Sequence, residues 1–212
     1  MKRFIIGISG ASGSIYGIRL IEELIKRDYK LYIVITKMGR LIIERELKVK
    51  LYTGVKNKKE IKKNLLRYLI EKTKISERDL SEKIEYLPID LMDAPISSGS
   101  FITEGMAVVP CSMSTLSAIS QAGSFNLLER AADVNIKERR PLILVPREMP
   151  LSALHLENML RLSKLGVIIA PPIPGFYSDP QNLDDLVNFV VGKIMDCLKI
   201  SNNLFKRWSE LN

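Results

Sequence analysis

The sequence predicts an open, doubly wound α/β sheet in a single domain over residues 1–212. Short apolar runs alternate with helix-like segments along the chain, as in a parallel sheet that is covered by helices on both faces. The chain has 212 residues, which is enough for one large core and short of two comfortable domains. Hydrophobic residues make up 46% of it and charged residues 26%, which is typical of a globular protein.

Each element is predicted from its local pattern. Strands are expected at the apolar runs 3–8, 31–35, 106–110, 142–146 and 167–170. Helices are expected between and after them at 13–27, 38–48, 57–72, 113–121, 126–138, 151–164 and 182–199. The last helix shows its apolar stripe most clearly, because leucine, valine and isoleucine recur at helical spacing from Leu183 to Leu198.

The first predicted strand ends in the glycine- and serine-rich loop Gly10-Ala11-Ser12-Gly13, and a helical pattern follows directly. Backbone N–H groups and the helix dipole favour an anion at such a helix start. A phosphate-bearing ligand is therefore one interpretation of this loop. A tight turn between strand and helix is an equally weighted one, because the spacing is neither the full dinucleotide fingerprint nor a P-loop.

Polar residues also follow the other predicted strands. Thr36 follows the second strand, Ser112 to Thr115 follow the third, and Arg147 and Glu148 follow the fourth. Ligands of open α/β sheets bind beyond the carboxyl ends of the strands. Hydroxyls, backbone donors, one guanidinium and one carboxylate therefore converge on one edge, which predicts a site for a polar, anionic ligand.

Three further segments are candidates for ligand contact. The loop Ser97–Phe101 has three serines around one glycine, which suits either close backbone contact with a ligand or a plain connector. Arg130, Asp133 and Lys137 lie near one another on one predicted helix, so they indicate either an intrahelical ion-pair ladder or a second phosphate site. Tyr177 follows a proline-rich turn and either braces the core or contacts the ligand.

The histidine and cysteine content excludes several kinds of site. His155 is the only histidine, which excludes sites with several histidine ligands, and no metal is expected. Cys111 and Cys197 lie far apart, so a disulfide framework is not expected. No apolar run has the length of a membrane helix, and the N-terminus enters a strand rather than a secretory signal. We therefore expect a cytoplasmic location and no membrane partner.

The formal net charge is +8, and the positive charge is concentrated in one segment. Residues 48–74 contain two acidic residues, Glu60 and Glu71, against Lys48, Lys50, Lys56, Lys58, Lys59, Lys62, Lys63, Arg67, Lys72 and Lys74. Such a segment indicates either a nucleic-acid face or a solvated helical face. The second interpretation is favoured, and no nucleic-acid partner is expected, because lysine outnumbers arginine and the aromatic residues form no stacking series.

Eight ordered motifs resemble the UbiX/Pad-type flavin prenyltransferases over nearly the whole chain. They are Gly7–Gly13, Ser97–Phe101, Pro110–Leu116, Arg130–Asp133, Lys137–Arg140, Pro146–Glu148, His155–Asn158 and Gly175–Tyr177. Residues 47–90 match poorly, since they are longer and more basic than the family pattern. A basic insertion around 48–90 is therefore expected.

The resemblance implies a Rossmann-like flavoprotein that transfers a prenyl group. Members of this family take reduced FMN and dimethylallyl phosphate, and they join the dimethylallyl group to N5 and C6 of the flavin. The prenylated FMN then serves a separate UbiD-type decarboxylase, in ubiquinone biosynthesis or in aromatic-acid decarboxylation. The family is metal-independent, and its members usually assemble as homo-dodecamers with sites between subunits.

The resemblance also implies roles for individual residues. FMN binding is implied for Gly10, Ala11, Ser12, Thr36, Ser112, Met113, Ser114, Thr115 and Arg147. Binding of dimethylallyl phosphate is implied for Arg130, Lys137, Glu148, Tyr177 and Lys193. Catalytic roles are implied for Ser12, Lys137 and Glu148, with Trp208 near the prenyl group. Lys193 stands where the family has arginine, so it keeps the charge but loses the bidentate fork.

Two alternatives remain open at this point. One is an FMN-dependent cysteine decarboxylase of the same fold, which needs a catalytic histidine early in the chain and a reactive cysteine on a flap. The positions of His155, Cys111 and Cys197 do not fit that pattern. The other is a noncatalytic module that binds FMN, or nucleic acid through residues 48–74. The presence of Lys137, Glu148 and Tyr177 argues against a noncatalytic module.

Overall fold

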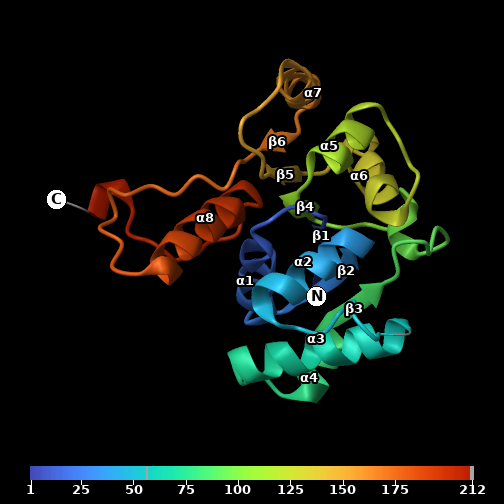
Figure 1. The fold of residues 1–212 in the computed structure, drawn as a ribbon, viewed down its shortest axis with the longest axis vertical. Helices are drawn as coiled ribbons and strands as arrows, with labels where there is room; N and C mark the ends of the chain where they lie inside the picture. Colours follow the sequence, from blue (N-terminus) through green and yellow to red (C-terminus); the bar gives the residue numbers. More distant parts are fainter. Residues whose placement is uncertain (56, 211–212) are drawn as a thin grey trace.

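A parallel sheet forms the centre of the molecule and confirms the predicted doubly wound arrangement (Figure 1). The computed structural model describes residues 1–55 and 57–210. In that part of the chain, one sheet has the strand order β3-β2-β1-β4-β5-β6, and every neighbouring pair is parallel. The strands are β1 (Lys2–Ile8), β2 (Tyr29–Ile35), β3 (Ile84–Leu87), β4 (Gly105–Cys111), β5 (Leu142–Pro146) and β6 (Ile168–Ile169).

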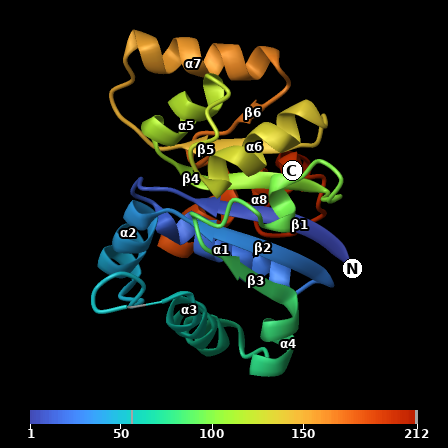
Figure 2. The same cartoon turned by 90° about the vertical axis from the view of Figure 1, so that its right-hand side faces the viewer.

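Helices cover both faces of this sheet (Figure 2). Residues of α1 to α4 and of α8 share one apolar core with the sheet, and residues of α5, α6 and α7 share the other. The helices are α1 (Ser14–Ile25), α2 (Lys37–Leu47), α3 (Lys58–Thr73), α4 (Glu77–Lys83), α5 (Met113–Ser120), α6 (Leu127–Lys137), α7 (Ala153–Lys164) and α8 (Leu183–Cys197), with the 3₁₀ turns η1 (Pro95–Ser97) and η2 (Trp208–Glu210). None of the helices in the described residues is long and apolar enough to cross a membrane.

The surroundings of β1 explain why its sequence is continuously apolar. Phe4, Ile6 and Ile8 point into the core shared with α1 and α8, whereas Ile5 points into the core shared with α6. Successive side chains of a strand alternate between faces, and both faces are covered, so neither set is polar. The same pattern predicts β2, β4 and β5.

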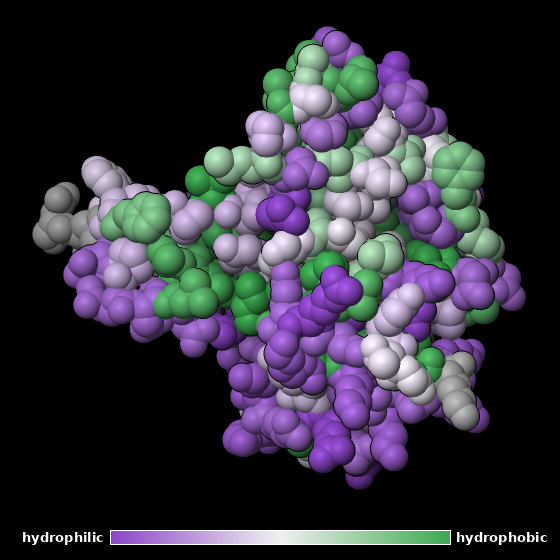
Figure 3. Space-filling model, in the orientation of Figure 1, coloured by the Kyte–Doolittle hydropathy of each residue, from purple (hydrophilic) through white to green (hydrophobic). Residues whose placement is uncertain are grey.

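The segment expected as a basic insertion, residues 48–90, contributes α3, α4 and the edge strand β3. The sequence pattern predicts neither β3 nor α4. The strand is Ile-Glu-Tyr-Leu, in which a charged residue interrupts a run of four, and α4 buries only Leu80. On α3 the buried residues are Ile61, Leu65, Leu66 and Leu69. Its lysines lie on the outer, solvated face, which Figure 3 shows as hydrophilic at the lower end of the molecule.

Glu44 on α2 fixes the loop that leads into this segment. Its Oε2 accepts hydrogen bonds from the backbone N–H groups of Leu51 (3.1 Å), Tyr52 (2.8 Å) and Thr53 (2.9 Å). Hydrogen bonds from the Thr53 side chain and from these N–H groups outweigh desolvation and lower the pKa of Glu44 to about 2. The carboxylate of Glu44 is therefore ionised in the folded protein at neutral pH.

We expect Glu44→Gln to lower the melting temperature at pH 7 by a few degrees, because losing a charged acceptor of backbone N–H groups costs on the order of 1 kcal/mol. The pKa of Glu44 is depressed on folding, so its contribution is present above the unfolded value and is lost as the pH falls towards about 2. The difference between the variant and the wild type should therefore shrink on acidification. Thermal unfolding at several pH values measures this, with the exposed Glu71→Gln as control; a difference that is independent of pH would contradict the prediction.

Candidate functional site

The strand order reverses between β1 and β4, which is where ligands bind in open α/β sheets. Ser9, which is buried directly after β1, ties the two strand ends together. Its Oγ donates to the carbonyl oxygen of Pro110 (3.1 Å) and accepts from the N–H of Ser112 (2.7 Å). The loop that starts α1 and the start of α5 are therefore held side by side at the carboxyl edge of the sheet.

The N-terminal end of α1, where the loop pattern allowed a phosphate, holds a carboxylate of the chain itself. Glu46 on α2 accepts from the N–H of Gly13 (3.1 Å) and from the N–H (2.8 Å) and Oγ (2.6 Å) of Ser14. Desolvation raises the pKa of Glu46, but hydrogen bonds from Ser14, Ser12 and Gly13 outweigh it and hold the pKa below its ordinary value. This helix end is therefore already neutralised by an anion.

Sequence reasoning missed Glu46 because it lies 33 residues from Gly13 on an ordinary amphipathic helix. The residues that cap the helices do give one signal that α1 needs an acceptor from another part of the chain. Each of the helices α2 to α8 begins at a residue whose side chain accepts a hydrogen bond from the first turn. The helix α1 begins at Gly13, which has no side chain to do so, and it therefore needs an acceptor from elsewhere.

The N-terminal end of α5 is open. Ser112 caps the helix by accepting from the N–H of Thr115 (3.3 Å). Within residues 1–55 and 57–210, the N–H groups of Met113 and Ser114 make no hydrogen bond. Free N–H groups at a helix start form an anion site. The four residues Ser112 to Thr115, predicted to bind cofactor, thus form a helix start whose first two N–H groups have no acceptor in the described residues. At the neighbouring start of α1, Glu46 already accepts from two N–H groups.

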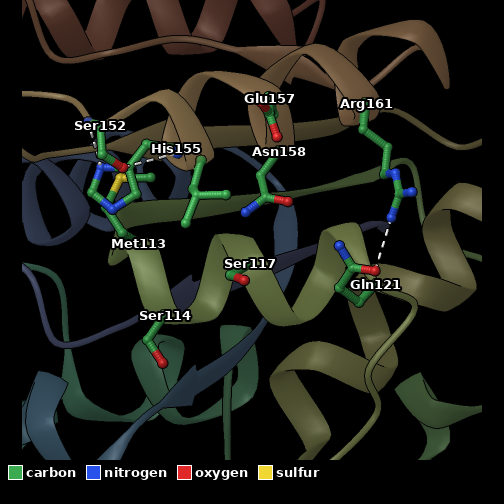
Figure 4. A pocket seen from close by; sticks show the side chains of 10 residues that line it. Met113, Ser114, Ser117, Gln121, Ser152, His155, Glu157, Asn158 and Arg161 are labelled. Atoms are coloured by element: carbon green, nitrogen blue, oxygen red, sulfur yellow. Dashed lines mark hydrogen bonds between the residues drawn. The ribbon is translucent and has the colours of Figure 1, made fainter.

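A cavity of about 620 Å³ lies between α5 and α7 and starts at Met113 and Ser114 (Figure 4). Polar side chains of α7, among them His155 and Asn158, point across it toward α5. The imidazole of His155 accepts from the N–H of Ser152 as part of the α7 capping box (3.3 Å). This contact gives His155 a structural role at the start of α7.

Arg147 and Glu148 follow β5 and lie on the same edge as the first loop. The Arg147 Nε donates to the carbonyl oxygen of Ser12 (3.3 Å), so the structure brings together two residues that are 135 positions apart. The carboxylate of Glu148 accepts from the N–H of Met149 (3.1 Å) and is otherwise exposed to solvent. Ser12 and Arg147 are thus in contact, and Glu148 follows Arg147 directly in the chain.

Gly10 and Thr36 close the edge on the side of β2. A Cβ at Gly10 would lie 2.5 Å from the Cβ of Met38, so only glycine allows α2 to start this close to the first loop. Thr36 caps α2 by accepting from the N–H of Gly39 (3.0 Å). Ala11 is buried between these segments. Every residue predicted to bind the cofactor therefore lies along the carboxyl edge of β1, β2, β4 and β5.

Lys137 lies at the other edge of the sheet. It ends α6, and β5 begins only five residues later, so Lys137 is at the amino ends of the strands. Its ammonium is paired with Glu138 and lies against Gly99. A strand of seven residues such as β1 separates the two edges by about 20 Å. A single chain therefore does not bring Lys137 to Ser12, Arg147 or Glu148.

Arg130 lies on α6 as well. Its Nε donates to the carbonyl oxygen of Ser97 in η1 (3.1 Å), and its Nη1 pairs with Asp133 (2.9 Å). The predicted intrahelical ion pair is thus present, but it does not extend to Lys137, which pairs with Glu138. The loop Ser97–Phe101 is held by this helix and by Arg140, which donates to the carbonyl oxygen of Phe101 (2.8 Å).

Tyr177 and Lys193 belong to an arm formed by α8 and the flanking segments, on the left of Figure 1. The ring of Tyr177 lies 5.3 Å from that of Trp208 and 5.6 Å from that of Phe189, both edge to face. Lys193 is exposed, 4.0 Å from Asp196. In the described residues, no hydrogen bond or ion pair joins Tyr177 or Lys193 to Arg147 or Ser12.

Comparison with known proteins assigns the chain to a family. Residues 1–195 match the family model described as Flavoprotein. The flavin prenyltransferase UbiX of Halalkalibacterium halodurans is 45% identical, over 98% of this chain and 93% of the relative. The flavin prenyltransferase UbiX of Methanocaldococcus jannaschii is 44% identical, over 97% and 98%.

Solved structures agree with this assignment. AnUbiX (PadA1), in complex with FMN and dimethylallyl pyrophosphate, has a TM-score of 0.81 and 35% identity, with 98% of this chain and 97% of that chain covered. A dodecameric FMN-dependent UbiX-like decarboxylase from Escherichia coli O157:H7 has a TM-score of 0.79 and 38% identity, with 97% and 98% covered. The cysteine decarboxylase TvaF, at 13% identity and a TM-score of 0.52, shares the fold alone. The chain therefore belongs to the flavoprotein family, in its group of UbiX flavin prenyltransferases.

Proposed function

We propose that the protein transfers the dimethylallyl group of dimethylallyl phosphate to N5 and C6 of reduced FMN and releases prenylated FMN to a UbiD-type decarboxylase. One observation carries this proposal. At the reversal of the strand order, the open start of α5 lies beside the loop Gly10–Ser12, which Arg147 joins by its hydrogen bond to Ser12. The bound ligands of AnUbiX (PadA1) support the same substrates.

The donors of this edge fit FMN. The N–H groups of Met113 and Ser114, with the hydroxyls of Ser114 and Thr115, suit a phosphate. The Arg147 guanidinium adds a positive charge on the same side. Gly10 and Thr36 lie beside each other at the same edge, because the missing Cβ of Gly10 lets α2 start close to the first loop. When bound, reduced FMN supplies the two nucleophilic atoms of the reaction.

Dimethylallyl phosphate needs residues that one chain keeps apart. Glu148 lies on the carboxyl edge, Lys137 on the amino edge and Tyr177 and Lys193 on the arm. We therefore propose that a second copy, within a homo-oligomer and most simply a dodecamer, brings Lys137 and Arg130 to the carboxyl edge of the first. The dodecameric relative from Escherichia coli O157:H7, at 38% identity, supports this arrangement.

The side chains would then act on a leaving phosphate. Negative charge grows on that phosphate as the allylic C–O bond breaks, and Lys137, Lys193 and Arg130 stabilise it without forming a covalent bond. Tyr177 and the exposed Trp208 supply aromatic surface that excludes water from the allylic cation. Ser12 holds the first loop in place through its carbonyl bond to Arg147. The carboxylate oxygens of Glu148 accept the proton that the transfer releases.

We expect Glu148→Gln to lower the turnover number by a factor on the order of 10² to 10⁴ and to leave the FMN dissociation constant unchanged, because only the proton acceptor is lost. The glutamine side chain has the same shape as glutamate, and its carbonyl oxygen can still accept from the N–H of Met149. Single-turnover kinetics under anaerobic conditions measure the loss, with the exposed Glu77→Gln on α4 as control. Full turnover in the Glu148 variant would remove this residue from the mechanism.

The function itself is tested by anaerobic incubation of the protein with reduced FMN and dimethylallyl phosphate, followed by mass spectrometry of the extracted flavin. A mass gain of one five-carbon prenyl unit is expected. Bound but unmodified FMN, with the pyrophosphate and geranyl analogues also unreactive, would contradict the proposal and favour a noncatalytic FMN-binding protein.

The cysteine decarboxylase alternative finds no support in the site. Cys111 is buried inside β4, where burial raises the pKa of its thiol far above the ordinary value. Cys197 ends α8, and burial raises its pKa as well. Neither thiol therefore has the exposed, low-pKa surroundings of a reactive cysteine.

A further inference from the structure

The C-terminal tail, residues 201–210, turns back after α8 and runs along it, on the arm at the left of Figure 1. Asn202 fixes the turn, because it is buried and its Nδ2 donates to the carbonyl oxygen of Gly192 (3.1 Å) and to Oδ1 of Asp196 (2.9 Å), both on α8. A Cβ at Gly192 would lie 2.6 Å from the ring of Phe205, so glycine lets the tail pack closely against the helix. The tail is therefore a packed part of the arm.

Asp196 holds the far end of this tail on the same helix. Arg207 donates from Nη1 to Oδ2 (2.5 Å) and from Nη2 to Oδ1 (2.9 Å) of Asp196, which is the paired geometry of a strong charge-assisted contact. The guanidinium also lies 4.6 Å over the ring of Phe205. Desolvation raises the pKa of Asp196, but hydrogen bonds from Arg207 and Asn202 outweigh it and hold the pKa below its ordinary value. The carboxylate is thus ionised where it binds the tail.

The contact between Asp196 and Arg207 decides where the ring of Trp208 lies. Trp208 directly follows Arg207 in the chain, and its ring lies 5.3 Å from that of Tyr177, edge to face. Trp208 is 71% exposed and Tyr177 is 43% exposed. A mostly exposed ring has little packing to hold it, so its place depends on the neighbouring residues that fix its backbone.

We propose that Asp196 is a positioning residue for prenyl transfer. The inference rests on the proposed function, in which Tyr177 and Trp208 form an aromatic wall around the prenyl group and Lys193 binds the phosphate. Oδ2 of Asp196 lies 4.0 Å from Nζ of Lys193 and 2.5 Å from Nη1 of Arg207. One negative charge between two cations thus holds the aromatic wall in a fixed relation to the ammonium that takes the phosphate.

Trp208 is the only tryptophan of the chain, so its fluorescence reports on the tail directly. Asp196→Asn keeps the shape of the side chain and removes its charge. We expect this variant of the full chain to show at least a twofold larger fast component in time-resolved fluorescence anisotropy, with an unchanged circular dichroism spectrum. Asp184→Asn, in the first turn of α8, removes a carboxylate that pairs with Arg19 (2.8 Å) and should match the wild type. A wild-type anisotropy decay in Asp196→Asn would overturn the inference.

Kinetics give a second readout, which a merely structural role would not produce. Inorganic phosphate probes the cation Lys193 without the aromatic wall, whereas dimethylallyl phosphate probes both. We expect Asp196→Asn to lower kcat/KM for dimethylallyl phosphate about tenfold and not to weaken inhibition by inorganic phosphate, because Lys193 keeps its charge. Equal weakening of both ligands would mean a general distortion of the arm and would overturn the inference, as would an unchanged kcat/KM.

Arg207→Lys tests the same contact from the tail and covers an Asp196 variant that fails to fold. Lysine keeps the charge but loses the fork that binds both carboxylate oxygens, so the fast anisotropy component should again increase. Asp196→Glu keeps the negative charge and should retain more of the kcat/KM than Asp196→Asn. A wild-type anisotropy decay in Arg207→Lys would contradict the inference. Failure of the proposed function looks different, because the wild type would then form no prenylated FMN although its tail stays fixed on α8.

Discussion

Lys137→Ala and Arg147→Ala should each abolish prenyl transfer when pure, and a mixture of the two inactive proteins should regain activity. Under the proposed function, each variant removes a cation that would face a phosphate, so each should lose a factor on the order of 10² to 10³ in turnover. Lys137 and Arg147 lie at opposite edges of one chain. If a ligand site joins the carboxyl edge of one copy to the α6 end of another, a mixed oligomer contains some sites in which both residues are intact.

The size of the recovery follows from random mixing. In an equal mixture, half of the carboxyl edges have Arg147 and half of the α6 ends have Lys137, so about one quarter of the sites are complete. The measurement is prenylated FMN formed per total chain after the two variants are coexpressed, with native mass spectrometry to confirm mixed oligomers. Each variant alone is the control. If both residues acted within one chain, mixed oligomers would stay inactive, and that result would contradict the proposal of a shared site.

The strands that sequence predicts well are those buried on both faces. The strands β1, β2, β4 and β5 are continuous apolar runs because helices cover them on each side. This reasoning does not predict the edge strand β3, because Glu85 interrupts its four residues, Ile84–Leu87. Glu85 lies opposite Tyr32 of β2, at the edge of the sheet. The position of β3 is decided by pairing with β2, which is a long-range contact that no local pattern contains.

The candidate site also has a part that the sequence predicts and a part that it does not. The edge that holds Ser12, Ser112 and Arg147 can be predicted, because the carboxyl ends of parallel strands meet by topology. The occupant of the α1 start cannot be, since Glu46 reaches it from another helix. The resemblance to a family names Lys137 as a substrate ligand, but the topology of one chain places it at the wrong edge. This difference is the reason for proposing that a second copy completes the site.

Ser114→Asp should weaken FMN binding by a factor on the order of 100, and it should leave riboflavin binding unchanged. A carboxylate about 4 Å from a phosphate at the start of α5 adds a repulsion of about 4 kcal/mol at the effective dielectric constant of a protein surface. Screening by salt lowers this toward the roughly 3 kcal/mol that a hundredfold loss of affinity represents. Riboflavin lacks the phosphate and is therefore the matched ligand. Ser117→Asp places the same charge one turn further along α5, in the same cavity, and should have a clearly smaller effect.

The variant Glu46→Ala separates the two helix starts. If the phosphate of FMN belonged at α1, removal of the Glu46 carboxylate would free the N–H groups of Gly13 and Ser14 and tighten FMN binding. We expect no tightening, because the free donors are those of Met113 and Ser114 on α5, and the loop of α1 instead loses the acceptor that holds it. Fluorescence quenching titrations of FMN and riboflavin at two salt concentrations measure both effects. Equal weakening of the two flavins by Ser114→Asp, together with tighter FMN binding by Glu46→Ala, would move the phosphate site to α1.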